Sequence, residues 1–178
     1  MKWWNNLKRF FYNRSLNARL TTINLNHSVV NIEGVHSIGI IYDANNSAND
    51  VAINQFAENM RTSGKQVEIL AFVTDKKMES KPGMALVNGK GVNWVDVPVE
   101  EKAFQFANKN FDLLLCCFIG ENLSLEYISA ISQAQWRVGV FAENKTALYD
   151  MMVNMGGQTS LQYFIDQSIY FLSQIKAA

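Results

Sequence analysis

Acidic side chains follow several apolar runs of this 178-residue chain. Asp43, Asp75, Glu121 and Glu143 each come directly or shortly after such a run. The carboxyl ends of parallel strands meet at one edge of a sheet, and carboxylate oxygens are the ligands that Mg²⁺ prefers. Acidic residues also favour solvated loops and helix N-termini. We interpret the four carboxylates in this second way and predict no metal site.

The loops after residues 36–43 and 111–119 form the best candidate for a ligand cleft. If these two runs are neighbouring central strands, their loops flank the point where strand order reverses, which is where open parallel sheets bind ligands. The candidate lining consists of Asp43, Asn45, Asp75, Gly120, Glu121 and Asn122. A phosphate-binding loop needs glycines so that backbone amides can approach the phosphate. The loop "YDANNSAND" has none, so we predict no cofactor.

Nucleophilic side chains are few and poorly placed for catalysis. The histidines, His27 and His36, lie before or at the start of the first predicted strand, at the edge opposite the cleft. Cys116 and Cys117 are neighbours in an apolar run, so on a strand they point to opposite faces, which disfavours a disulfide between them. They also lack zinc-ligand spacing. These residues favour a non-enzymatic protein, and free buried cysteines favour a cytoplasmic location.

Alternating strands and helices must position these residues. The predicted strands are 36–43, 66–73, 92–97, 111–119 and 136–141. The predicted helices run from Ser47 to just before Gly64, and over 99–109, 123–134 and 160–175, while 146–155 stays unassigned. This alternation is typical of right-handed crossovers and a mainly parallel sheet. We predict an α/β fold, a three-layer Rossmann-like domain with about five strands in the order 3-2-1-4-5.

A basic, aromatic segment opens the chain: "MKWWNNLKRFFYNRSLNARL". Five basic residues and no acidic one precede Glu33, whereas the rest of the chain holds 11 basic and 16 acidic residues. Apolar residues recur in the segment at helical spacing: Trp3, Trp4, Leu7, Phe10 and Phe11. They predict an amphipathic helix over 2–14. We divide the chain into this helix with its connector, 1–35, and one Rossmann-like domain, 36–178.

Neither a membrane span nor a signal peptide is recognisable in the sequence. No apolar run approaches the length of a membrane-crossing helix. The apolar residues near the start are interrupted by polar and basic ones, so they form no signal-peptide core. We predict a protein without an integral membrane segment.

The N-terminal segment gives the strongest indication of function. Its candidate interaction residues are Lys2, Trp3, Trp4, Lys8, Arg9, Phe11, Arg14 and Arg19. In a first interpretation its aromatic face packs on the protein's own body, or on a second copy in a homodimer. In a second, it binds RNA or DNA by phosphate neutralisation and base stacking. In a third, it lies on an anionic membrane surface.

Residues 111–141, "FDLLLCCFIGENLSLEYISAISQAQWRVGVF", carry a resemblance to known proteins. Together with "IGIIYDA" at 38–44 and "GKQVEILAFV" at 64–73, this stretch resembles a family of short bacterial proteins, a domain of unknown function. It is more distantly similar to the N-terminal Rossmann half of heptosyltransferase-type glycosyltransferases, in which a D-L-[LIV] strand and a helix precede a strand reading R-[IV]-G. The resemblance implies a Rossmann-like fold and bacterial origin.

The residues and the resemblance together predict a cytoplasmic, non-enzymatic interaction protein whose N-terminal helix contacts a partner. The alternative is a small-molecule or sugar-nucleotide binding protein, or a reduced glycosyltransferase-like enzyme. That alternative would use the cleft at the carboxyl ends of the central strands.

Overall fold

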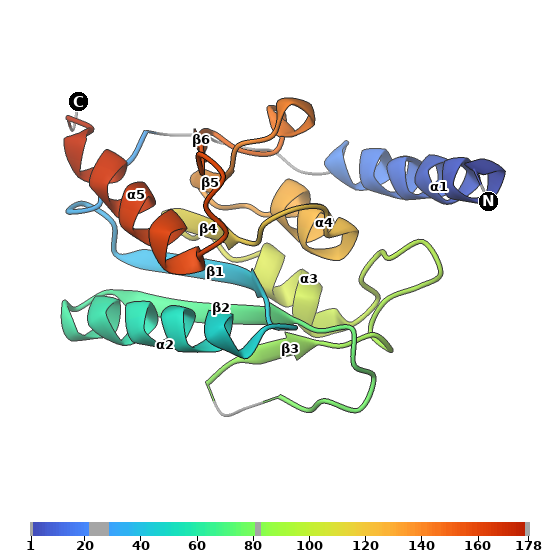
Figure 1. Cartoon of the computed structure of the whole chain (residues 1–178), viewed down its shortest axis with the longest axis horizontal. Coiled ribbons are helices and arrows are strands. Elements are labelled where there is room, and N and C mark those ends of the chain that lie inside the picture. Colours follow the sequence, from blue (N-terminus) through green and yellow to red (C-terminus); the bar gives the residue numbers. More distant parts are fainter. Residues whose placement is uncertain (1, 22–28, 81–82, 177–178) are drawn as a thin grey trace.

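A parallel β-sheet lies at the centre of the molecule (Figure 1). The structure is a computed structural model that describes residues 2–21, 29–80 and 83–176, without the Lys2 side chain. In this part of the chain the strands are β1 (Ser37–Asp43), β2 (Gln66–Phe72), β3 (Ala85–Val87), β4 (Leu113–Cys117), β5 (Trp136–Val140) and β6 (Met151–Val153). Their order is β3-β2-β1-β4-β5-β6, and all pairings are parallel. The predicted α/β fold and strand order are confirmed, and β6 adds a sixth strand within the segment that the sequence left unassigned.

The central strands β1 and β4 are buried on both faces because the chain supplies continuous apolar runs there. Tyr42 near the end of β1 lies beside Cys117 at the end of β4. Cys116 packs on one side of the sheet and Cys117 on the other, as neighbouring residues on a strand must. The loops that follow the two strands therefore start side by side at the carboxyl edge.

Helices cover both faces of the sheet. On one face lie α2 (Ser47–Thr62) and α5 (Leu161–Gln174), and on the other α3 (Glu101–Ala107) and α4 (Leu123–Ile131). Asn46 caps α2 and Asn122 caps α4, each by accepting a hydrogen bond from a backbone N–H of the first turn. Both helices thus begin directly after the carboxyl ends of central strands, where the candidate cleft was expected.

The predicted third strand over 92–97 is wrong. Strand β3 lies earlier in the chain, and 92–97 is a loop outside the sheet, with an isolated antiparallel bridge between Val92 and Pro98. The Asn93 side chain accepts hydrogen bonds from the backbone N–H groups of Val95 and Val97 at 3.0 and 3.1 Å. Asp96 has a positive φ of 63°. Asparagine and aspartate favour such turns over strand pairing, which the apolar alternation of this stretch concealed.

Helix α1 (Lys2–Leu20) lies at the edge of the molecule, beside α4 (Figure 1). It extends to Leu20, beyond the predicted end at residue 14, because Ser15 and Leu16 contact the body. The Ser15 hydroxyl lies 3.2 Å from the Tyr127 hydroxyl, and Leu16 packs on the core. The connector that follows, residues 22–28 with His27, lies outside the described residues. Within the described ranges, no helix is long and apolar enough to cross a membrane.

Candidate functional site

Hydrogen bonds close the carboxyl edge between β1 and β4, where the cleft was predicted. The Asn122 side chain donates to Asp43 at 3.2 Å, and the Asn45 backbone N–H donates to the other oxygen of Asp43 at 2.9 Å. The side-chain oxygen of Asn45 in turn accepts from the backbone and the hydroxyl of Thr74 at 2.9 and 2.7 Å. Asp43, Asn45 and Asn122 are therefore brought together, but their polar groups join the loops after β1, β2 and β4 to one another.

Asp75 takes no part in this network. In the loop after β2 its carboxylate accepts a hydrogen bond from the backbone N–H of Lys77 at 2.9 Å, which is a local turn. In the part of the chain that the structure describes, no group of three or more His, Cys, Asp or Glu residues is placed to hold a metal ion.

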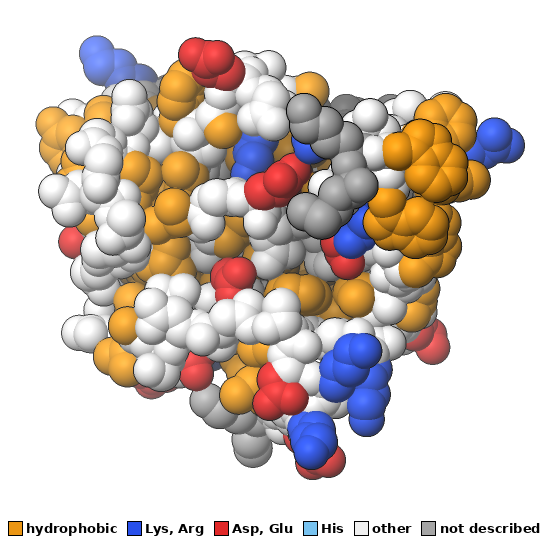
Figure 2. Space-filling model, turned by 45° about the vertical axis from the view of Figure 1, so that its right-hand side comes forward, with side chains coloured by type: hydrophobic (Ala, Val, Ile, Leu, Met, Phe, Trp, Pro, Cys, Tyr) orange, Lys and Arg blue, Asp and Glu red, His pale blue; other side chains and the backbone are white. Residues whose placement is uncertain are grey.

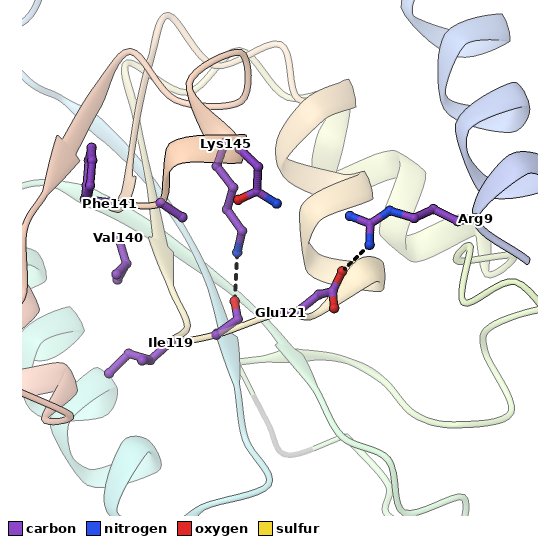
Figure 3. A pocket seen from close by; sticks show the side chains of 9 residues that line it. Arg9, Ile119, Glu121, Val140, Phe141 and Lys145 are labelled. Atoms are coloured by element: carbon purple, nitrogen blue, oxygen red, sulfur yellow. Dashed lines mark hydrogen bonds and ion pairs between the residues drawn. The ribbon is translucent and has the colours of Figure 1, made fainter. Parts of the chain in front are cut away.

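A cavity lies one strand further along the same edge, between the loops after β4 and β5 (Figure 3). Its volume is about 420 Å³. Its lining residues are Arg9, Ile119, Gly120, Glu121, Val140, Phe141, Ala142, Asn144 and Lys145. Two of the predicted cleft residues, Gly120 and Glu121, belong to this lining. Asp43, Asn45, Asp75 and Asn122 do not.

Lys145 places a buried cation at this cavity. The residue belongs to a short 3₁₀-helix, Glu143–Lys145, after β5, and only 8% of its surface is exposed. Its ammonium donates to the backbone carbonyl of Gly120 at 2.7 Å (Figure 3) and pairs with the Glu126 carboxylate at 2.9 Å. Gly120 has a φ of +88°, a backbone conformation that glycine adopts without strain. Burying both charges costs solvation energy that their attraction does not always repay, so this pair is a candidate functional feature.

Arg9 of α1 forms the rim of the cavity. Its guanidinium pairs with the carboxylate of Glu121 at 3.2 Å (Figure 3), and both side chains are more than half exposed. Exposed ion pairs of this kind stabilise a protein by only about 0–1 kcal/mol. The sequence placed Arg9 on the interaction helix and Glu121 in the cleft, and the docking of α1 brings them together.

An apolar side and two strand cysteines lie near the charged groups of the cavity. Ile119, Val140 and Phe141 form an apolar side opposite the charged groups (Figure 3). The nearest strand carries Cys116 and Cys117, whose thiols are buried beneath the sheet surface. Burial raises the pKa of Cys116 to about 12 and raises that of Cys117 well above its usual value. At neutral pH both remain thiols, which are poor nucleophiles.

The face of α1 that packs on the body centres on Tyr12. This ring is buried, its hydroxyl donates to the backbone carbonyl of Leu123 at 3.0 Å, and it meets the Tyr127 ring edge-on at 5.9 Å. Lys8 pairs with Asp96 at 2.5 Å, and the Arg19 guanidinium lies 4.7 Å from the centre of the Phe104 ring. Three of the predicted arm cations, Lys8, Arg9 and Arg19, thus contact the protein's own body. The Arg14 side chain is exposed.

Five exposed aromatic residues form a continuous surface, which we call the aromatic surface: Trp3, Trp4, Phe10 and Phe11 of α1, and Trp94 of the 92–97 loop. Their exposed fractions range from 41% to 72%. The centre of a Trp94 ring lies 6.1 Å from that of Trp4 and 5.5 Å from that of Phe11. Trp3 contacts Trp4, and Phe10 contacts Phe11, so these two rings extend the cluster. Figure 2 shows hydrophobic side chains gathered over α1 at this edge of the molecule. Three of the five, Trp3, Trp4 and Phe11, are among the candidate interaction residues from the sequence. Phe10 was placed on the apolar face of the helix, and Trp94 was missed because 92–97 was predicted to be a strand.

These features define a three-layer α/β protein with a parallel sheet, whose carboxyl edge is bordered by a docked N-terminal helix. The chain belongs to a family of unknown function, DUF6913, whose family model matches residues 8–175. The match begins within α1, at Lys8, and so includes most of the residues that dock this helix. No curated protein and no solved structure matches the chain.

Proposed function

We propose that this protein is an interaction protein that docks on an anionic membrane surface through its aromatic surface. The observation that carries the proposal is the exposure of five aromatic side chains in mutual contact. Soluble proteins rarely leave a continuous apolar patch open unless it contacts something. Docking of α1 centres on its other face, around Tyr12. Trp4 and Phe11 also contact Trp94 of the body, but all five rings keep an exposed side that the fold does not cover.

The chemistry of the aromatic surface suits the boundary between lipid and water. Three of its members, Trp3, Trp4 and Trp94, are tryptophans. Tryptophan has an apolar ring with one polar N–H group and is enriched at the headgroup level of membranes. The surface is also held in a fixed shape, because Lys8 pairs with Asp96 and the Ser124 hydroxyl donates to the Asp96 carbonyl at 2.8 Å. A preformed surface loses little conformational entropy on docking.

Basic residues border the aromatic surface. Arg14 is exposed on α1, and Lys76 lines a shallow groove together with Trp94. Lys90 is exposed in the turn next to Gly89, which lines the same groove. Each cation near an anionic membrane contributes about 1 kcal/mol to binding. The aromatic rings would supply most of the affinity, and these cations would favour anionic over neutral lipid.

Nucleic acid fits the same surface less well. Affinity for RNA or DNA depends mainly on cations that neutralise phosphates. Lys8, Arg9 and Arg19 already contact Asp96, Glu121 and the Phe104 ring. The described part of α1 thus leaves Arg14 as its exposed cation without an ion pair. RNA binding is therefore the competing outcome of the test below.

Co-sedimentation with lipid vesicles tests the proposal. The full chain is mixed with vesicles of phosphatidylcholine, with or without phosphatidylglycerol, and separately with bulk RNA. We expect sedimentation with the anionic vesicles, and a loss of about tenfold or more in the double variant Trp3→Ser/Phe10→Ser, since each ring contributes about 1.5–3 kcal/mol when buried. Both residues are exposed, so the variant should fold normally.

The double variant Tyr170→Ser/Phe171→Ser is the matched control. These two rings form a similar exposed pair on α5, 5.4 Å apart, away from the aromatic surface. Equal losses in the two variants, or binding of the native protein to RNA and not to vesicles, would contradict the proposal.

A further inference from the structure

We infer that the cavity between the loops after β4 and β5 binds a small organic carboxylate that has an apolar part. The cavity lies at the carboxyl edge of the sheet, where parallel α/β folds bind ligands. Its volume of about 420 Å³ falls in the range of small-molecule sites, about 300–1,000 Å³. This site is separate from the aromatic surface, because Arg9 leaves α1 on the side that faces Glu121 and α4.

Two cationic groups supply the polar half of the site. Arg9 has five N–H donors in a planar fork that matches a carboxylate, and its ion pair with Glu121 is made through Nη1. Lys145 has three N–H donors, of which two reach Gly120 and Glu126. A carboxylate that enters between the two loops can pair with Arg9 and accept a hydrogen bond from Lys145.

The ligand charge would be balanced mainly by Arg9. Lys145 is already neutralised by Glu126 at 2.9 Å, so it acts on a ligand chiefly as a hydrogen-bond donor of fixed position. Glu121 is the one acidic residue in the lining and holds Arg9 at an exposed rim. A ligand carboxylate would therefore compete with Glu121 for the Arg9 guanidinium. Removing the Glu121 charge should then increase the affinity for the ligand.

Apolar side chains supply the other half of the site. Ile119 and Phe141 line the cavity and are 41% and 47% exposed, so their apolar surface is open to a ligand. Val140, the last residue of β5, also lines the cavity and is partly buried. The hydrocarbon part of a ligand would cover these side chains while its carboxylate reaches the cations.

Titration calorimetry and NMR with simple probes test this inference on the full chain. Hexanoate and benzoate are compared with hexanamide and benzamide, which have the same shapes without the charge. We expect the carboxylates to bind, with chemical-shift changes at Gly120 and Phe141, and the amides to bind about fivefold or more weakly. The variant Arg9→Gln should weaken carboxylate binding by a similar factor, whereas Arg14→Gln, on the same helix outside the cavity, should leave it unchanged.

The variant Glu121→Gln tests whether Glu121 competes with the ligand for Arg9. It removes the competing carboxylate, so hexanoate should bind more tightly than it does to the native protein. If the Arg9–Glu121 pair serves only to hold α1 in place, Glu121→Gln should not increase the affinity for hexanoate. Equal binding of hexanoate and hexanamide, or unchanged hexanoate binding in both Arg9→Gln and Glu121→Gln, would overturn the inference.

Discussion

Gly139 shows how one residue sets the packing beside the cavity. It lies in β5, and a Cβ atom added there would come within 2.5 Å of the Tyr149 ring. Real side chains do not approach so closely, so the glycine is required by the ring that packs over the strand. A glycine within a strand lets a neighbouring group approach closely, and at Gly139 this group is the buried Tyr149 ring.

The substitution Gly139→Ala should destabilise the protein by about 1–3 kcal/mol, because Tyr149 has to move within a close-packed core. Urea denaturation followed by circular dichroism measures the change. Gly34→Ala is the control, since its added Cβ would lie 3.7 Å from the nearest atom. If the two variants are equally stable, Tyr149 does not pack on Gly139 as described.

Single residues of the site were only partly predictable, for a physical reason. Asp43 ends β1, and Asn45 and Asn122 lie in the loops after β1 and β4, so the strand order brings these predicted cleft residues to one edge of the sheet. The pairing of Arg9 with Glu121 depends on how α1 docks, and no local pattern in the chain encodes that orientation. The position of Lys145 in the loop after β5 could have indicated a residue at the carboxyl edge of the sheet. The burial of its ammonium could not be predicted, because it depends on the ion pair with Glu126 of α4.

Helix α1 is the element that joins the two proposed sites. One side of it contributes Arg9 to the cavity, another contributes four rings to the aromatic surface, and Tyr12 anchors it between them. The helical spacing was visible in the sequence. The face that packs inward was not, because it mixes Lys8, Tyr12 and Ser15 instead of presenting an apolar stripe.

Removing the Tyr12 ring should loosen α1 without disturbing the sheet. In Tyr12→Ala the helix loses a buried ring and the hydrogen bond to Leu123, a change of about 2–3 kcal/mol in local stability. Hydrogen exchange of the α1 amides should then be about 30–150-fold faster. Amides of β1 and β4 should exchange at the native rate.

Phe10→Ala is the control for this measurement, because its ring lies on the exposed side of the same helix. Unchanged α1 exchange in Tyr12→Ala would show that Tyr12 does not anchor the helix. Equally accelerated exchange in β1 and β4 would show that α1 and the sheet unfold together.

At the scale of the whole molecule, the parallel sheet with helices on both faces was the most predictable property. Continuous apolar runs identify β1 and β4, and their alternation with helices fixes parallel crossovers on both faces. The edge strands β3 and β6 have three residues each, too few for a hydrophobic pattern to identify. The apolar alternation of 92–97 predicts the third strand there instead, whereas the structure has a turn that presents Trp94.

The whole molecule also separates its two candidate surfaces. The central strands hold the loops of the cavity in place, while the 92–97 loop and α1 form the aromatic surface at one edge (Figure 2). A membrane bound at that edge would leave the sheet and its cavity in solution. The account therefore depends first on whether the aromatic surface meets lipid.

Quenching of Trp94 fluorescence by brominated lipid tests that claim most directly. Two single-tryptophan proteins are compared, one retaining Trp94 and one retaining Trp136, with the other tryptophans changed to phenylalanine. Trp136 is partly buried at the start of β5, and its ring N–H has no hydrogen-bond partner in the described residues, so its replacement costs no hydrogen bond. The account predicts that vesicles of anionic brominated lipid quench Trp94 strongly and leave Trp136 unchanged. Absence of quenching at Trp94, or equal quenching at both positions, would contradict it.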